Sequence, residues 1–255
     1  MIERLKKQTK ELRLPYMNKN IEEHIKQANI ENSSYEEFLT NILDYEIELR
    51  RNNSTKKRIQ TAKFPYKKYL DEIDIASLPD GVKSHYKNIC SLDFIKDRQN
   101  IILAGNPGTG KSHISIGLGI KACMEGYNVY YAHVPNMIIE LKEAKNERVL
   151  NRLKKKFQKY DLIILDELGY ISFDKEGAEL LFNFISSRSE IKSTIITTNL
   201  SFDRWKEIFH DPVITAAIVD RITHKSYVIN MNGNSYRMKQ TKEFLLSKTQ
   251  NKSSD

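Results

Sequence analysis

The residues best suited to chemistry form one glycine-rich stretch, which directly follows a short apolar run at residues 101–104. Glycines let a backbone wrap so closely that successive N–H groups point at phosphate oxygens, and a helix that starts after such a loop adds the positive end of its dipole. In this pattern the lysine reaches the β- and γ-phosphates of a nucleotide, and the serine offers its hydroxyl to Mg²⁺. The stretch therefore predicts a nucleotide site with the pattern G-x-x-x-x-G-K-[ST], formed by Gly105, Asn106, Pro107, Gly108, Thr109, Gly110, Lys111 and Ser112.

Two adjacent carboxylates, Asp166 and Glu167, end a second apolar run at residues 162–165. Ligands of α/β proteins bind outside the carboxyl ends of the parallel strands, which would place this pair near the phosphates. Asp166 suits Mg²⁺ coordination through a water molecule, and Glu167 can polarise a water for in-line attack on the γ-phosphate. The alternative is a solvated acidic turn, which the accompanying loop disfavours. Together the two stretches predict a Mg²⁺-dependent ATPase.

The elements that must position these residues are short apolar runs alternating with helical patterns from residue 100 onward. Such alternation predicts an α/β fold, with a parallel sheet flanked by helices. One strand candidate lies between the loop and Asp166 in the chain, so the strands that precede the two sites need not be adjacent. The helix after the loop is expected to run to about Glu125. The predicted strands cover residues 101–104, 128–134, 162–165, 193–198 and 226–231.

The first 60 residues differ from the rest because they lack glycine and have apolar residues at helical spacing. They predict a small all-helical N-terminal domain at residues 1–63. Ser33 or Ser34 would be the N-cap of a helix whose first turn holds Glu36 and Glu37. The rest of the chain is divided into a loosely structured connector with short helices at 64–99, an ATPase domain at 100–245 and a flexible tail at 246–255.

Composition excludes several other classes. The chain has 255 residues and only two cysteines, Cys90 and Cys123, so no zinc cluster or disulfide framework is expected. Its longest apolar runs are far shorter than the roughly 20 residues that cross a bilayer, and no secretory signal opens the sequence. No membrane association and a cytoplasmic location are expected.

Positive charge is concentrated near the end of the predicted helical domain. The net charge is +8, and residues 49–70 hold eight basic residues and no acidic one. This stretch predicts contact with DNA phosphates without base reading, and a charged linker is the alternative. Its Phe64 and Tyr66 are interpreted as a packing hinge, and a second basic stretch at 142–159 can face either DNA or solvent. The residues assigned to DNA contact are Arg50, Arg51, Lys56, Lys57 and Arg58.

Several further stretches resemble one protein family. They lie at residues 105–113, 121–129, 165–170, 180–190, 194–199, 202–205, 211–222 and 233–239. Together they are similar to the IstB-like helper ATPases of bacterial insertion sequences, in the IstB/DnaC branch of AAA+ proteins, and the similarity covers nearly the whole chain. The resemblance implies a P-loop AAA+ core, ATP and Mg²⁺ as cofactors, and a homo-oligomer on duplex DNA. It also implies a separately encoded transposase as partner, which this chain would assist in target selection.

The same resemblance gives roles to three more residues. Asn199 follows a predicted strand at the sensor-one position, where its amide would orient the lytic water; an Asn that caps the next helix is the alternative. Arg221 lies where AAA+ proteins carry an arginine finger that reaches the γ-phosphate of the neighbouring subunit. Arg237 is the second choice for that role, or a second sensor. The predicted catalytic set is Lys111, Glu167, Asn199 and Arg221.

Two other functions stay open. A DnaC-like helicase loader would share the ATPase core but grip a replicative helicase with its first domain. A nucleotide-gated scaffold would bind ATP and hardly hydrolyse it. The basic, helical first domain favours the transposition helper over the loader.

Overall fold

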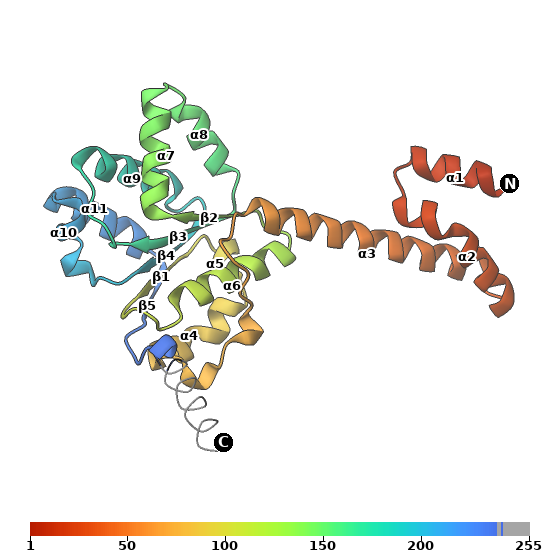
Figure 1. Ribbon diagram of the computed structural model, residues 1–255, viewed down its shortest axis with the longest axis horizontal. Helices are drawn as coiled ribbons and strands as arrows, with labels where there is room; N and C mark the ends of the chain where they lie inside the picture. Colours follow the sequence, from red (N-terminus) through yellow and green to blue (C-terminus); the bar gives the residue numbers. More distant parts are fainter. Residues whose placement is uncertain (239–240, 242–255) are drawn as a thin grey trace, which may run out of the picture. The chain divides into compact units, whose positions relative to one another are not determined.

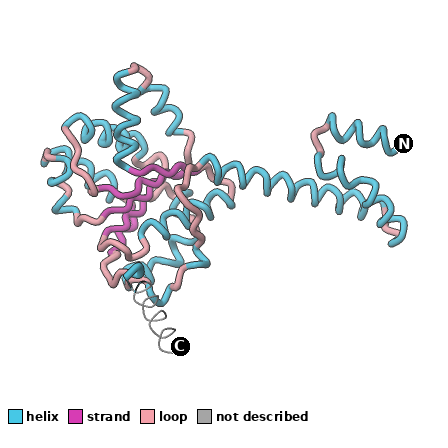
Figure 2. The backbone as a smooth tube through the Cα atoms, in the orientation of Figure 1, coloured by secondary structure: helices cyan, strands magenta, loops and turns pink. Residues whose placement is uncertain are grey.

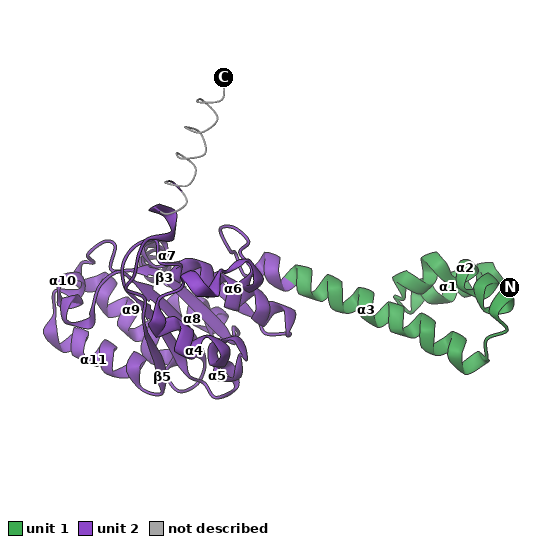
Figure 3. Cartoon of the chain, turned by 90° about the horizontal axis from the view of Figure 1, so that it is seen from below, with its two compact units in different colours: residues 1–57 green, residues 58–255 purple. Residues whose placement is uncertain are grey.

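The computed structural model describes residues 1–238 and residue 241, and the chain divides into two compact units between Lys57 and Arg58 (Figure 3). The first unit is helical, and Ser34 caps its last helix. The Ser34 hydroxyl accepts a hydrogen bond from the Glu37 N–H (3.2 Å), and the Glu37 carboxylate accepts one from the Ser34 N–H (2.9 Å). This pair confirms Ser34 as the cap. The helices of this unit are α1 (Ile2–Glu11), α2 (Pro15–Glu31) and most of α3 (Tyr35–Thr61).

Five parallel strands form the sheet of the second unit (Figures 1 and 2). Their order across the sheet is β2-β3-β4-β1-β5. The strand before the phosphate loop is β1 and the strand that reaches Asp166 is β3, and β4 separates them, so the prediction that these strands need not be adjacent is confirmed. The strand candidate that lies between them in the chain, β2, is at the edge of the sheet and is not the inserted strand. The strands are β1 (Asn100–Ala104), β2 (Val129–His133), β3 (Leu162–Leu168), β4 (Ser193–Thr198) and β5 (Ser226–Asn230).

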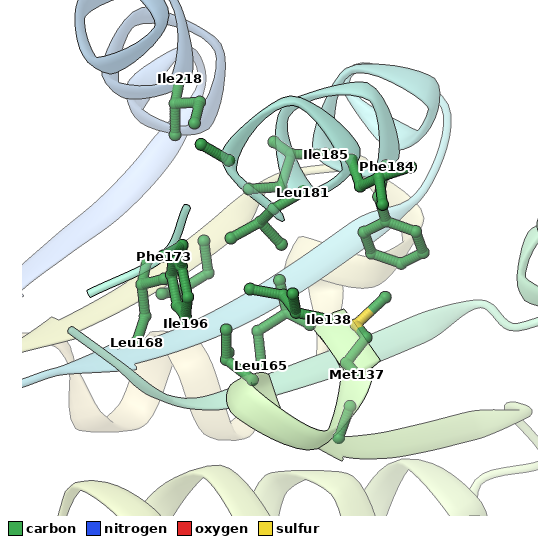
Figure 4. Packing of buried hydrophobic residues seen from close by; sticks show 14 of the residues in the cluster. Met137, Ile138, Leu165, Leu168, Phe173, Leu181, Phe184, Ile185, Ile196 and Ile218 are labelled. Carbon is green, nitrogen blue, oxygen red and sulfur yellow. The ribbon is translucent and has the colours of Figure 1, made fainter. Parts of the chain in front are cut away.

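Helices cover both faces of this sheet, because successive side chains of a strand point to opposite faces. In β1, Ile101 and Leu103 belong to one core and Ile102 to the other. On the second face, Met137 and Phe184 pack close to the sheet (Figure 4). The helices of the first face are α4 (Asp80–Cys90), α5 (Asp93–Lys96) and α6 (Lys111–Met124); those of the second are α7 (Val134–Asn146), α8 (Leu150–Gln158), α9 (Lys175–Arg188), α10 (Lys206–Phe209) and α11 (Pro212–Thr223).

The segment between α3 and β1 packs against the first face. It contains short 3-10 helices at Leu70–Glu72 and Ile75–Ser77 as well as α4 and α5. Ala62, Leu78 and Leu92 lie in the same core as Ile101. The short helices expected in the connector are therefore present, and they form part of the second unit. The domain bounds at 63/64 and 99/100 stay predictions, and residues 246–255 lie outside the described residues.

Across the residues that the structure describes, no helix has both the length and the apolar character needed to span a membrane.

Candidate nucleotide-binding site

The predicted phosphate loop lies between the end of β1 and the start of α6. Gly108 and Gly110 have φ angles of 80° and 94°, in the left-handed region that favours glycine. A Cβ atom on Gly108 would also lie only 2.2 Å from Ser235 Oγ. The Tyr236 N–H donates to the Gly108 carbonyl (2.9 Å), so the chain after β5 fastens the loop. Two of the motif's glycines are thus required by backbone geometry.

Lys111 is the first residue of α6, and its ammonium lies inside the loop. It donates to the carbonyl oxygens of Gly105 (2.6 Å) and Asn106 (2.7 Å). The side chain is buried, and burial lowers the pKa of Lys111 to about 8, although Asp166 opposes the shift. The loop therefore positions a cation where phosphate oxygens would lie.

Asp166 is fixed by three hydroxyl groups. Ser112 Oγ donates to its Oδ1 (3.1 Å), the Tyr131 hydroxyl donates to its Oδ2 (2.6 Å), and Thr197 Oγ1 also donates to Oδ1. Only 3% of Asp166 is exposed. Burial, followed by the hydrogen bond to Asp166, raises the pKa of Tyr131, so the phenol remains a donor. The carboxylate is therefore held rigidly next to the loop serine.

Ser112 and Asp166 fit a magnesium site of the nucleotide-dependent kind. Mg²⁺ keeps several waters and binds through one or two carboxylates plus substrate phosphates, and seldom in an all-protein cage. Here one hydroxyl and one carboxylate adjoin the loop, 3.1 Å apart. Among the described residues, no three His, Cys, Asp or Glu side chains form a metal cluster. The Ser112 hydroxyl and the Asp166 carboxylate therefore suit a Mg²⁺ ion that binds together with the nucleotide phosphates.

Glu167 is positioned by two neighbouring strands. Its backbone has a positive φ of 62°, and its N–H donates to Thr197 Oγ1 (2.9 Å). Its Oε2 lies 2.7 Å from His133 Nε2, at the end of β2. The carboxylate is partly exposed, as a group that must reach a water molecule requires. His133 therefore orients Glu167 from the side.

These groups meet at one pocket of about 690 Å³. Its wall includes Lys111, Ser112 and Glu167, Asn199 directly after β4, and the loop residues 107–110, so the structure brings eight of the predicted residues together. Asp166 does not line the wall but is hydrogen-bonded to Ser112. The 3-10 helix after Asn199 (Phe202–Arg204) has Ser201 as its N-cap, without a side-chain cap bond. Other parts of the chain complete the wall with Tyr66, Lys68, Glu72, Ile73, Leu78, Tyr170, Tyr236 and Arg237.

Comparison with known proteins identifies the family. The model of the IstB-like ATP-binding protein family matches residues 7–244. The chain belongs to this family. It is 34% identical to the insertion sequence IS5376 putative ATP-binding protein of Geobacillus stearothermophilus, over 94% of this chain and 96% of that protein. It is 33% identical to the insertion sequence IS21 putative ATP-binding protein of Pseudomonas aeruginosa, over 91% and 88% of the two chains.

Solved structures confirm the fold of this IstB-like chain. The crystal structure of DnaI matches with a TM-score of 0.54 and 20% identity, over 66% of this chain and 89% of that one. AMPPCP-bound DnaA from Aquifex aeolicus matches with a TM-score of 0.55 and 18% identity, over 72% and 56%. The predicted α/β core with a parallel sheet flanked by helices is therefore confirmed, and the predicted helical region precedes it.

The two arginine candidates of the IstB-like chain lie in different places. Arg221 is exposed in the last turn of α11, where its guanidinium carbon lies 5.5 Å from the centre of the Phe182 ring. It is not among the residues that line the pocket, whereas Arg237 is. Arg221 would therefore have to act on the nucleotide of another chain, and Arg237 can act on its own. Both roles stay predictions.

The five residues assigned to DNA contact do not form one uniform set. Arg58 is half-buried, and its Nε donates to the Cys123 carbonyl at the end of α6 (2.8 Å). Arg50 Nη2 donates to the Arg13 carbonyl within the helical unit (3.1 Å). DNA contact stays a prediction for Arg50, Arg51, Lys56, Lys57 and Arg58.

The second basic stretch is partly neutralised. Lys142 pairs with Asp174 and Lys145 with Glu176, each at 2.6 Å. These lysines link α7 to the start of α9. These two lysines therefore have a structural role, which is neither of the two predicted alternatives, DNA contact or exposure to solvent.

Sequence reasoning missed Tyr131, His133 and Thr197. Tyr131 and His133 alternate along β2, and His133 lies opposite Asp166 in the strand register. The spacing of two polar residues at the end of a buried strand was the available signal. Of the predicted packing hinge, Phe64 packs as expected, with its ring centre 6.3 Å from that of Tyr131. Tyr66 instead lines the pocket.

Proposed function

We propose that this protein hydrolyses ATP with Mg²⁺, assembles as a homo-oligomer on duplex DNA and assists a partner transposase in target selection. The observation that carries the hydrolysis step is the convergence of Lys111, Ser112 and Glu167 at one pocket, with Asp166 hydrogen-bonded to Ser112. The transposase role is supported by relatives whose names place them in insertion sequences. The basic residues at the end of α3 support DNA contact.

The pocket suggests a division of labour for an in-line hydrolysis. The loop N–H groups and Lys111 would bind the β- and γ-phosphates, and the apolar side chains of Ile73 and Leu78 in the same wall offer a surface for the base. Glu167 would accept a proton from the attacking water, and the Asn199 amide would orient that water. Ser112 and Asp166 would hold Mg²⁺, Asp166 through a water molecule, and the metal would supply positive charge to the phosphates.

Replacing Glu167 tests the proposed chemistry. General-base catalysis contributes typically 10²–10⁴-fold, so Glu167→Gln should lower kcat for ATP hydrolysis at least about 100-fold. Its ATP affinity should stay near that of the wild type, because Lys111 and the loop remain. The matched control is Glu179→Gln, an exposed glutamate on α9 outside the pocket. Unchanged turnover in Glu167→Gln would remove Glu167 from the mechanism and favour a scaffold that only binds ATP.

A DNA titration tests the assembly. The protein with ATP and Mg²⁺ is mixed with duplex DNA and with single strands of equal length, and affinity and complex size are followed together. The proposal expects large ATP-dependent complexes on duplex DNA that weaken steeply with salt, since phosphate contacts release counterions. Preference for single strands without assembly on duplex would favour the helicase loader.

A further inference from the structure

Residues 62–72 form a strap that is fastened across α6. The Ala62 carbonyl accepts a hydrogen bond from the Tyr131 N–H of β2 (2.8 Å). Near the other end of the strap, the Tyr69 carbonyl lies 3.0 Å from His113 Nε2 on α6. The Tyr86 hydroxyl donates to the Leu70 carbonyl (3.2 Å). The strap is therefore anchored on both sides of the segment 64–68.

Two glycines of α6 make room for this strap. A Cβ atom on Gly117 would lie 2.7 Å from Leu70 Cδ2, and one on Gly119 would lie 2.8 Å from Phe64 Cε1 as well as 2.7 Å from Ile164 Cδ1 of β3. Helix-interior glycine costs roughly 0.5–1 kcal/mol relative to alanine, so two of them in one helix need a reason. Close packing of the strap supplies that reason.

Between the anchors, the strap supplies two side chains to the nucleotide pocket. Tyr66 and Lys68 line its wall together with Lys111 and Glu167, while Lys67 between them does not. Burial raises the pKa of Tyr66, and Asp166 adds to the shift, so the phenol stays protonated at neutral pH. The Tyr66 hydroxyl is thus close enough to Asp166 and Glu167 to feel their charge, at the end of the pocket where phosphate oxygens would lie, and Lys68 adds an ammonium to the same wall.

We propose that Tyr66 and Lys68 are ligands of the phosphate chain of ATP, with the Tyr66 hydroxyl donating to the γ-phosphate. This inference rests on the proposed function, because it requires ATP in the pocket. The strap begins directly after α3 ends at Thr61. Loss of the γ-phosphate would therefore remove a contact made by the segment that follows the basic helix.

The test compares a non-hydrolysable ATP analogue with ADP. Dissociation constants for both, with Mg²⁺, are measured by calorimetry for the wild type, Tyr66→Phe and Lys68→Ala. Tyr66→Phe should weaken the analogue about tenfold, equivalent to about 1.4 kcal/mol, and ADP less than about twofold. Lys68→Ala should weaken the analogue at least about threefold. The control Lys67→Ala has the same charge change on the same strap and should alter neither affinity.

The outcomes separate this inference from the function on which it rests. If the wild type binds neither nucleotide, the proposed function fails. If the wild type binds both, a variant that leaves the analogue's affinity unchanged removes that residue from the site. Equal weakening of both nucleotides by Tyr66→Phe would overturn the γ-phosphate contact and assign the hydroxyl a packing role. Thermal unfolding without nucleotide checks that each variant is folded.

Discussion

The hydroxyl network around Asp166 predicts that Tyr131→Phe lowers stability by a defined amount. The substitution removes only an oxygen, the donor to Oδ2 at 2.6 Å, and leaves the ring in place. Asp166 is 3% exposed, so the carboxylate cannot regain a full hydration shell. A hydrogen bond to a charged group contributes about 1.5–3 kcal/mol, which is the expected loss in the free energy of unfolding. Since 1 kcal/mol shifts the midpoint temperature of thermal unfolding by about 2–4 °C, this temperature should fall by about 3–12 °C.

The measurement is thermal and urea unfolding of Tyr131→Phe beside Tyr130→Phe. Tyr130 is the preceding residue on β2, and its hydroxyl donates to Glu140 over 3.3 Å. This longer bond to a partly exposed carboxylate should contribute less than about 1 kcal/mol. The half-saturating Mg²⁺ concentration for ATP hydrolysis should also rise in Tyr131→Phe alone. A stability loss no larger than that of Tyr130→Phe would refute the rigid network.

The loss in unfolding free energy caused by Tyr131→Phe should not vary with pH between 6.5 and 9. The folded-state pKa of Tyr131 is raised above the ordinary value of 10 by burial and by Asp166. A group with a raised pKa gives stability that is fully present below its unfolded pKa and is lost as the pH rises through the folded one. The window of loss therefore begins above pH 10. A difference between variants that shrinks between pH 6.5 and 9 would contradict the buried, hydrogen-bonded phenol.

Three further substitutions test the proposed roles in ATP binding and hydrolysis. Lys111→Ala should abolish measurable ATP binding, because it removes the cation at the loop; near-normal calorimetric affinity would show that Lys111 does not bind phosphate. His133→Ala should lower kcat about tenfold with little change in ATP affinity, since His133 orients Glu167 from outside the pocket wall; equal kcat values would show that Glu167 needs no orienting partner. Arg221→Ala should keep ATP binding by the monomer and lose DNA-dependent assembly and turnover; full activity in sedimentation and hydrolysis assays would remove the arginine finger.

The parts of the site that sequence predicts are those fixed by local geometry. The loop needs glycine at positive φ and a lysine at the first turn of a helix, and both requirements appear as a contiguous pattern of residue types. The loop can therefore be predicted without knowing any contact between distant parts of the chain. Counting strand candidates between the loop and Asp166 predicts only that the two strands need not be adjacent; that β4 is the strand between them depends on the pairing of distant segments.

The parts that sequence does not predict depend on register between strands that are far apart in the chain. His133 meets Glu167 because β2 and β3 pair with His133 opposite Asp166. A shift of the pairing by one residue would turn the alternating side chains of β2 to the other face, so Tyr131 and His133 would leave the site. The polar residues of β2 alone do not show how β2 is aligned with β3.

Charge counting has a related limit, and Arg58 shows its cause. The stretch at 49–70 contains eight cations that are equivalent by sequence. The structure distinguishes them: Arg58 Nε binds the Cys123 carbonyl near the C-terminus of α6, where unpaired carbonyls and the helix dipole favour a cation. The same helix carries Lys111 at its start and the two glycines that accommodate the strap along its length. Because its Nε binds the end of the helix that begins at the nucleotide loop, Arg58 has a structural role that a count of charges cannot distinguish from DNA contact.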